Sequence, residues 1–201
     1  MLRKALGFAV VLTLSFVFLA WPAEAYRQPV TVVDRTALTF TYIPISNTAS
    51  GGRSEFDVGL SYALGPTWDL LLSYSSEIGT GGSTPASAFR GGARYHLPPP
   101  NPDLDVYLTA QYANDLVFGV PTTGFLVGAG FTQQLAPTFK VYSAFAYHSQ
   151  LNVGLFDFGV QYQISRQLAV VVGISTGSEM VVGTVPLALD YFGLNYTLFS
   201  R

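Results

Sequence analysis

Charged residues at alternating positions are the side chains of this 201-residue chain best suited to chemistry. Glu55 and Asp57 are separated by one residue, and so are Arg94 and His96. In an extended chain, residues two apart point to the same side, so each pair would share one face of a strand. Charges of opposite sign on neighbouring strands attract each other and form ion pairs. The first question is therefore which elements bring these faces together.

Few residues offer metal, redox or phosphate chemistry. The chain has two histidines and no cysteine, which excludes most metal sites and any disulfide. It has no glycine-rich phosphate loop and no basic patch of the kind that binds nucleic acid. We therefore expect no cofactor and no nucleic-acid partner.

The stretch EFDVGLSYALGPTWDLLLSYSSE, from Glu55 to Glu77, alternates apolar and polar residues on both sides of Gly65-Pro66-Thr67. A period of two is typical of a β-strand, and Gly-Pro-Thr between two such runs predicts a hairpin turn. The apolar face includes Phe56 and Trp68, and the other face includes Asp57 and Asp69. The apolar face lies either against a protein core or against lipid.

Ten segments of the chain have this alternation. They are Ala37–Ser46, Glu55–Leu64, Trp68–Ser76, Phe89–Leu97, Leu104–Asn114, Phe125–Leu135, Phe139–His148, Val153–Ile164, Leu168–Ser175 and Leu187–Phe199. Most are close to the roughly 9–11 residues that a tilted membrane strand needs, and bacterial single-chain barrels have an even number of strands. Eight strands, with two weaker segments merged or lost, are the structural alternative.

The N-terminus has the pattern of a secretory signal peptide. Arg3 and Lys4 precede an apolar run from Ala5 to Ala20, and Ala23-Glu24-Ala25 follows as a small-x-small cleavage site. The alternative is a membrane-anchoring helix, but the run is short for one. We expect cleavage after Ala25, an N-terminal extension over 26–36 and a barrel domain over 37–201.

The composition favours a chain that spans a membrane with strands. Charged residues make up 11% of the sequence, against roughly 25% in ordinary globular proteins. No apolar stretch after the N-terminus approaches the ~20 residues of a membrane helix. Lipid offers no hydrogen-bond partner, so every backbone polar group of a membrane-spanning segment must be paired within the protein. Only helices and closed barrels meet this requirement. We therefore predict an all-β, transmembrane, antiparallel up-and-down β-barrel.

The links between the segments alternate in length. Short turns lie at Gly65–Thr67, Pro98–Asp103, Ala136–Thr138 and Ser165–Gln167, and longer links lie at Asn47–Ser54, Glu77–Ala88, Asp115–Gly124 and Thr176–Pro186. Only Ser149–Asn152 is short where a long link is due. Outer-membrane barrels have short periplasmic turns and longer outer loops. With ten strands, both termini are expected in the periplasm.

Aromatic residues gather near the ends of the predicted strands, on the apolar face. Those that define two predicted girdles include Tyr62, Trp68, Tyr74, Tyr95, Tyr112, Tyr147, Tyr162 and Tyr196. Amphipathic aromatic rings concentrate at the two interfaces of a bilayer, whereas a soluble barrel has no reason to place aromatic residues at its strand ends.

The C-terminal segment has an aromatic residue at Tyr191, a glycine two places on at Gly193, hydrophobic residues at the alternate positions Tyr196 and Leu198, and the aromatic Phe199. It resembles the terminal-strand signal of small bacterial outer-membrane β-barrel proteins, although Ser200 and Arg201 follow the usual terminal aromatic residue. The resemblance implies a location in the bacterial outer membrane and recognition by the barrel-assembly machinery.

The chain differs from two enzyme families of outer-membrane barrels. Lipid A deacylases use a histidine and a serine two residues apart, whereas His148 and Ser149 are adjacent and would point to opposite faces of a strand. Omptin proteases have ten strands that project far above the membrane, and this chain is too short for that. We therefore expect no enzymatic activity.

The polar faces would line the barrel lumen. The predicted lumen charge network comprises Glu55, Asp57, Asp69, Arg90, Arg94, His96, Asp105 and Asp157. We expect Arg94 and His96 to lie beside Asp69 and Asp105, because these residues occupy the turn-side ends of consecutive strands. Arg90 would reach Glu77 or Asp57. Small lumen residues, such as Gly130, Gly159 and Gly173, are expected to leave room for a narrow water path.

Two functions remain open at this point. The first is a narrow pore or passive channel for small solutes, with the arginines and their acidic partners as a gate or selectivity ring. The second is a closed structural or interaction barrel, whose charges only fix its geometry. Leu116–Val120 and Met180–Val185 are apolar, so they either extend strands or form a rim. Such a rim would bind a protein partner or lipopolysaccharide, and outer-membrane lipid would surround the barrel.

Overall fold

The computed structural model describes residues 22–23, 35–45, 53–79, 87–99, 101–117, 120–179, 185–186 and 189–198. The predicted signal peptide and the extension over 26–36 lie almost entirely outside these residues, as do Phe199 and most of Met180–Val185. Those assignments remain predictions.

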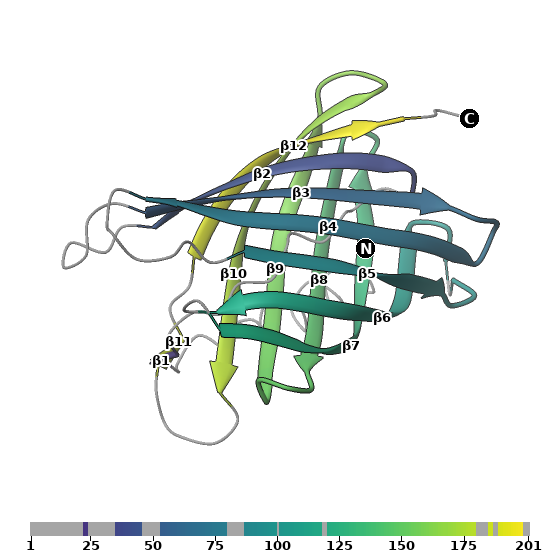
Figure 1. Cartoon of the computed structure of the whole chain (residues 1–201). Helices are drawn as coiled ribbons and strands as arrows, with labels where there is room; N and C mark the ends of the chain where they lie inside the picture. The colour runs from purple at the N-terminus through teal and green to yellow at the C-terminus, as the bar shows by residue number, and fades with distance from the viewer. Residues whose placement is uncertain are drawn as a thin grey trace.

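Ten antiparallel strands form one closed barrel (Figure 1). They are β2 (Ala37–Ile45), β3 (Arg53–Ala63), β4 (Trp68–Gly79), β5 (Ser87–His96), β6 (Leu104–Val117), β7 (Val120–Ala136), β8 (Phe139–His148), β9 (Val153–Gln163), β10 (Leu168–Glu179) and β12 (Leu189–Thr197). Each strand pairs with the next, and β12 closes the barrel by pairing with both β10 and β2. The ten-strand prediction is confirmed, and the eight-strand alternative is wrong.

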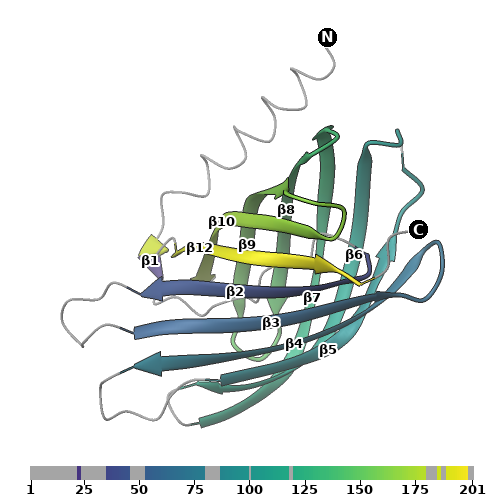
Figure 2. The ribbon, with the colours of Figure 1, turned by 90° about the horizontal axis from the view of Figure 1, so that it is seen from above.

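A short two-stranded sheet lies outside the barrel. It joins β1 (Pro22–Ala23) in parallel to β11 (Val185–Pro186). In the view of Figure 2, the strands of one barrel wall cross those of the opposite wall at a large angle. Such tilt accompanies the stagger that a sheet needs in order to close.

One predicted link is wrong. Asp115–Gly124 was expected to be a loop, but β6 continues to Val117 and β7 begins at Val120. The ladder extends because Leu116 pairs with Pro121 and Val117 with Val120. Leu116, Val117 and Val120 therefore extend strands, which is one of the two predicted roles of Leu116–Val120; residues 118–119 lie outside the described residues.

The two ends of the barrel differ in their links. We call the end with the links 64–67, 97–103, 137–138 and 164–167 the turn end, and the opposite end the loop end. The strand β2 starts and β12 finishes at the turn end. At the loop end, Asn152 has a left-handed backbone with φ of 55°, and its side chain accepts a hydrogen bond from Tyr147, which closes the tight link between β8 and β9.

The outer face of the barrel is apolar. Large side chains exposed there include Phe40, Val58, Leu70, Leu72, Leu108, Val127, Phe145, Val172 and Leu194. Among the strand side chains that the structure describes, no charged residue occupies an outward position. A charge on the lipid face of a barrel costs about 2–4 kcal/mol near the midplane. The exposed apolar band therefore fits a lipid environment and would be a liability in water.

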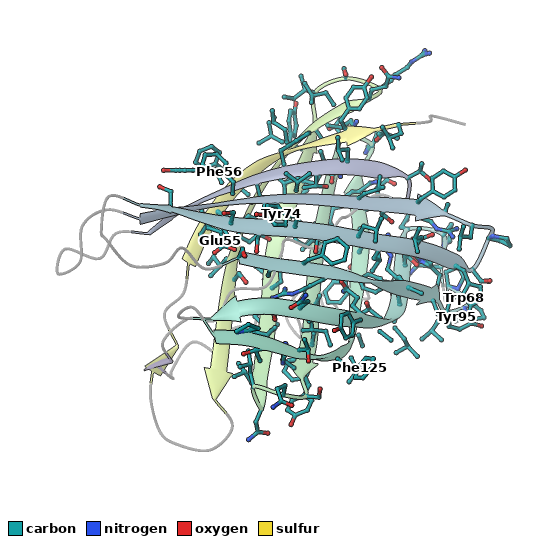
Figure 3. The ribbon with its side chains drawn as sticks, viewed as in Figure 1. Glu55, Phe56, Trp68, Tyr74, Tyr95 and Phe125 are labelled. Atoms are coloured by element: carbon teal, nitrogen blue, oxygen red, sulfur yellow. The ribbon has the colours of Figure 1, made fainter. Side chains whose placement is uncertain are left out.

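Aromatic side chains lie on this outer face near both ends. Figure 3 shows Trp68 and Tyr95 together near the turn end, where their ring centroids are 4.8 Å apart, and Phe56 toward the other end. Tyr112 and Phe125 form a second contact between β6 and β7, with centroids 6.0 Å apart. The predicted girdle residues exposed above 40% are Tyr62, Trp68, Tyr74, Tyr112, Tyr162 and Tyr196.

Inside the barrel, three tyrosines cover glycines on neighbouring strands. Tyr107 is paired across the sheet with Gly130, Tyr142 with Gly159, and Tyr191 with Gly173. A Cβ on any of these glycines would clash with the tyrosine ring. The expectation that small lumen residues leave room for water is therefore wrong for these glycines, because aromatic rings fill the space.

No helix among the described residues is long and apolar enough to cross a membrane.

The barrel should resist SDS until it is heated, because every strand is hydrogen-bonded on both sides. An unheated sample is expected to migrate apart from a boiled one on an SDS gel. A single band at the same position in both lanes would contradict the fold.

Gly159→Ala should destabilise the barrel by roughly 1–3 kcal/mol, the usual cost of overpacking. Its Cβ would lie 2.6 Å from Cζ of Tyr142 and 2.7 Å from the Val172 carbonyl oxygen. Gly65→Ala is the matched control, since no atom lies within 4 Å of the added Cβ. Urea unfolding in lipid vesicles measures both changes, and equal midpoints for the two variants would refute this packing.

Candidate functional site

The lumen has a charged wall and a less polar wall. Among the side chains that the structure describes, the inward acidic and basic ones are concentrated on β3–β6, where they are Glu55, Asp57, Asp69, Arg90, Arg94, His96, Asp105 and Asp115. The inward positions of β7 and β10 carry glycine, aliphatic and hydroxyl side chains for the most part, while β8 and β9 add Lys140, His148 and Asp157. The ionisable side chains that the structure describes therefore lie mostly on one side of the barrel.

Asp69 is the centre of a cluster near the turn end. Its carboxylate is fully buried, and Oδ2 accepts hydrogen bonds from Nη2 of Arg94 at 2.7 Å and from Nε of Arg94 at 3.0 Å. Oδ1 accepts from Nη2 of Arg35 at 2.8 Å. Nε2 of His96 lies 2.6 Å from Oδ2. One carboxylate therefore joins three basic side chains, each of which limits the cost of burying it.

Arg35 ties the start of β2 to the turn between β3 and β4. Besides Asp69, its guanidinium donates to the carbonyl oxygens of Pro66 and Gly65, both at 2.7 Å. In return, the Ser61 hydroxyl donates to the Arg35 carbonyl oxygen at 3.1 Å. The carbonyl partners of Arg35 thus lie 30 and 31 residues further along the sequence.

The cluster extends to β6 through His96 and Tyr107. Nδ1 of His96 lies 2.7 Å from Oδ1 of Asp105, so the ring bridges two carboxylates. The Arg94 guanidinium carbon lies 5.0 Å from the centroid of the Tyr107 ring, which is a cation–π distance. Arg94 also donates to the Ser61 hydroxyl at 3.1 Å. The cluster therefore spans β3 to β6.

A second group of charges surrounds Arg90, closer to the loop end. Arg90 is 1% exposed and interacts electrostatically with Asp57 and Glu55, which are also buried. Its Nε lies 3.4 Å from Oδ1 of Asp115. One cation is therefore surrounded by three carboxylates from β3 and β6.

Asp115 continues this group to β8. Nε2 of His148 lies 3.0 Å from Oδ2 of Asp115, and Nδ1 of His148 accepts the backbone N–H of Leu151 at 3.2 Å. Both ring nitrogens are thus engaged. The hydroxyl of Ser149 accepts a hydrogen bond from the Phe125 N–H instead, so the two adjacent residues do face different ways. This arrangement does not make His148 a base for Ser149.

A chain of neutral and acidic groups crosses the less polar wall. The Tyr142 and Tyr191 hydroxyls lie 2.6 Å apart, and Tyr191 donates to Oδ1 of Asp157 at 2.5 Å. Nearby, Nδ2 of Asn195 donates to Oε1 of Gln161 at 3.0 Å. Asp157 therefore accepts a hydrogen bond from a tyrosine hydroxyl, whereas Asp69 accepts hydrogen bonds from two arginines.

A cavity opens at the turn end, beyond the Asp69 cluster. Its volume is about 1090 Å³. The residues that line it are Arg35, Thr36, Tyr62, Ala63, Leu64, Gly65, Pro66, Gln134, Pro137, Lys140, Gln163, Arg166 and Thr197. They come from the start of β2, the end of β12 and three of the turn-end links, so the cavity is a vestibule at this mouth of the barrel.

The structure brings together most of the predicted charge pairs. Arg94 and His96 contact Asp69, and His96 also contacts Asp105. Arg90 interacts with Asp57, whereas the side chain of Glu77, its other predicted partner, lies outside the described residues. Asp157 accepts a hydrogen bond from Tyr191, which is not a member of the predicted network.

Three contributors were missed from the sequence. Arg35 was assigned to the N-terminal extension, Asp115 to a loop, and His148 to a strand end beside a loop. The signal for Asp115 was present, because it continues the inward alternation of Asp105 and Gln111 along β6. Arg35 has no such signal, since it precedes the first strand. Within the described part of the chain, no group of three acidic, histidine or cysteine side chains is arranged to hold a metal ion.

Asp69→Asn should destabilise the barrel by about 3–5 kcal/mol, because it leaves buried cations without their counter-charge. Asp103→Asn removes the same charge from an exposed turn-end link and should stay within about 0.5 kcal/mol of the parent chain. Urea unfolding in vesicles compares the two. Similar losses would show that Asp69 is not the centre of the cluster.

Comparisons with known proteins find likenesses of structure only. No protein-family model matches the chain, and no curated protein matches it. The KdgM porin in complex with disordered oligogalacturonate matches 82% of this chain and 100% of its own, with a TM-score of 0.47 and 11% identity. The NanC porin matches 82% of this chain and 99% of its own, with a TM-score of 0.41 and 8% identity.

The outer membrane phospholipase A from Escherichia coli matches 88% of this chain and 100% of its own, with a TM-score of 0.41 and 9% identity. With TM-scores below 0.5 and identities of 8–11%, none of these likenesses bears on what the chain does. The closed ten-stranded barrel, apolar outside and charged inside, resembles the small bacterial outer-membrane β-barrel proteins, as its terminal strand predicts.

Proposed function

We propose that this chain is an integral β-barrel of the bacterial outer membrane that forms a narrow, gated passage for small solutes. One observation carries the proposal. Ionisable side chains follow one another through the lumen, from the turn-end cavity past Asp69 and Arg90 to Asp115 and His148 near the loop end. A polar column of this kind is what a solute or ion path through a bilayer requires.

The energetics of the interior support this function over a purely structural one. Burying ion pairs is costly, and replacing them with well-packed apolar side chains is often neutral or stabilising. A barrel with no transport role would lose nothing by filling its lumen with residues such as Leu126 and Leu155, which already pack near the loop end. Stability alone therefore does not explain the charged wall of β3–β6.

The passage is closed in this conformation. Arg94 is 2% exposed and Arg90 is 1% exposed, so neither guanidinium faces open water. Opening requires at least one of them to exchange partners. Such an exchange is feasible because Asp69 retains Arg35 and His96 if Arg94 moves away, and the charge at this depth stays compensated.

A second function is favoured by the filled lumen itself. Tyr107, Tyr142 and Tyr191 are each at most 1% exposed and occupy the space above their glycines. A permanently closed barrel would act through its loops or its lipid face, with a protein or lipopolysaccharide as partner. For either function we propose that both termini are periplasmic and that the barrel-assembly machinery recognises the terminal strand, in which Tyr191 and Gly193 face inward and Tyr196 faces outward.

Single-channel recording in planar lipid bilayers tests the passage. The parent chain should show small, infrequent openings. Arg94→Ala should open more often or conduct more, because it removes the buried guanidinium of the Asp69 cluster while leaving two basic partners on the carboxylate.

Tyr95→Phe is the matched control, since Tyr95 is the next residue of β5 and faces the outer surface. It should behave like the parent. Baseline current in the parent, in Arg94→Ala and in Arg90→Ala would reject the passage and leave the closed barrel.

A further inference from the structure

We propose that the turn-end vestibule binds a small solute that carries two or more carboxylate or phosphate groups. This deepens the proposed function by giving the class of solute that enters at this mouth. Binding itself does not depend on whether the barrel conducts.

The vestibule has the size of a ligand site. At about 1090 Å³ it is slightly larger than the range of about 300–1,000 Å³ that is usual for pockets that hold drug-sized molecules. It is bounded by the links 64–67, 137–138 and 164–167 and by the ends of β2 and β12. A solute there would lie between the ordered turns of the mouth, outside the filled part of the lumen.

The charge of its wall has one sign. Arg35, Lys140 and Arg166 line the cavity, and none of the described lining residues is acidic. Asp69 is the acidic group bound to Arg35, but it is fully buried behind that side chain. Arg35 keeps 35% of its side chain exposed, so its outer edge still faces the vestibule. Like charges around a low-dielectric hollow concentrate its field and attract anions.

The three cations come from separate places around the mouth. Arg35 precedes β2, Lys140 is the inward residue near the start of β8, and Arg166 lies in the link between β9 and β10. One carboxylate engages a single guanidinium in a two-pronged bond, so cations on separate elements favour a ligand with several anionic groups. Arginine and lysine are also the side chains that bind carboxylate and phosphate in proteins most effectively.

Neutral donors complete the wall. Thr36 Oγ1 accepts the Ala63 N–H at 3.2 Å, which leaves the hydroxyl proton for a ligand oxygen. Thr197 and Gln134 also line the cavity. Hydroxyl and amide donors beside cations suit the oxygen-rich surface of a hydrophilic anion better than that of an apolar solute.

The test is isothermal titration of citrate into the folded barrel in neutral detergent micelles. Citrate is the probe because it is small and carries three carboxylates. The parent chain should bind it, and Lys140→Gln and Arg166→Gln should each bind about tenfold more weakly, since a charge-assisted hydrogen bond is worth about that factor. Raising the salt concentration should weaken binding in the parent.

Gln167→Glu is the matched control. It adds a negative charge beside Arg166 in the same link, but Gln167 is not among the lining residues, so it should weaken binding by less than Arg166→Gln. Sucrose, a neutral solute, should not bind. Each variant is first checked by its heat-dependent shift on an SDS gel, and variants that fail this check are replaced by Lys140→Arg and Arg166→Lys, which should retain binding.

The outcomes separate the two proposals. No citrate binding to the folded parent chain at millimolar concentration, or equal binding by the parent and both glutamine variants, overturns the vestibule site. Binding that depends on Lys140 and Arg166, in a barrel without conductance, supports the site and rejects the passage. Conductance without citrate binding rejects the site alone.

Discussion

A peptide group inside a bilayer has no water to bind, so each strand that crosses it needs a partner along both edges. The pairing of β12 with β10 and β2 meets this requirement and removes the last free edge. Closure also decides where polar side chains go, because one face of every strand meets lipid and the other meets the lumen. The clusters around Asp69 and Arg90 follow from this, since charges enclosed in a narrow barrel must compensate one another.

The two walls of the interior are filled in different ways, one by ion pairs and the other by aromatic rings. On β3–β6, long basic side chains reach acidic ones on neighbouring strands, and Asp69 alone joins Arg35, Arg94 and His96. On the opposite wall, the rings of Tyr142 and Tyr191 lie over glycines. Rigid rings fill volume without a counter-ion, whereas ion pairs can exchange partners. A barrel that has both rings and ion pairs has one rigid wall and one wall whose ion pairs can rearrange.

The alternation of side chains predicts most of this architecture, because a period of two is maintained along each strand and any polar residue on the apolar face would meet lipid. Neighbouring strands are consecutive in sequence, so the contacts of Arg94 and His96 with Asp69 and Asp105 could also be expected. Arg35 could not, since it lies outside the alternating segments. The tyrosine–glycine contacts depend on the exact pairing between strands, which a periodic pattern alone leaves open.

Because their contacts with glycine depend on the pairing between strands, Tyr142 and Tyr191 also help to fix that pairing. A slip of one residue between two strands would turn a whole apolar face into the lumen, so lipid opposes it strongly. A slip of two residues keeps both faces correct and escapes that penalty. It would, however, move the Tyr142 ring from Gly159 onto Asp157 or Gln161, and the Tyr191 ring from Gly173 onto Val171 or Ser175. The rings therefore allow only one alignment of β8 with β9 and only one of β10 with β12. Hydrophobicity alone would not distinguish these alignments from ones shifted by two residues.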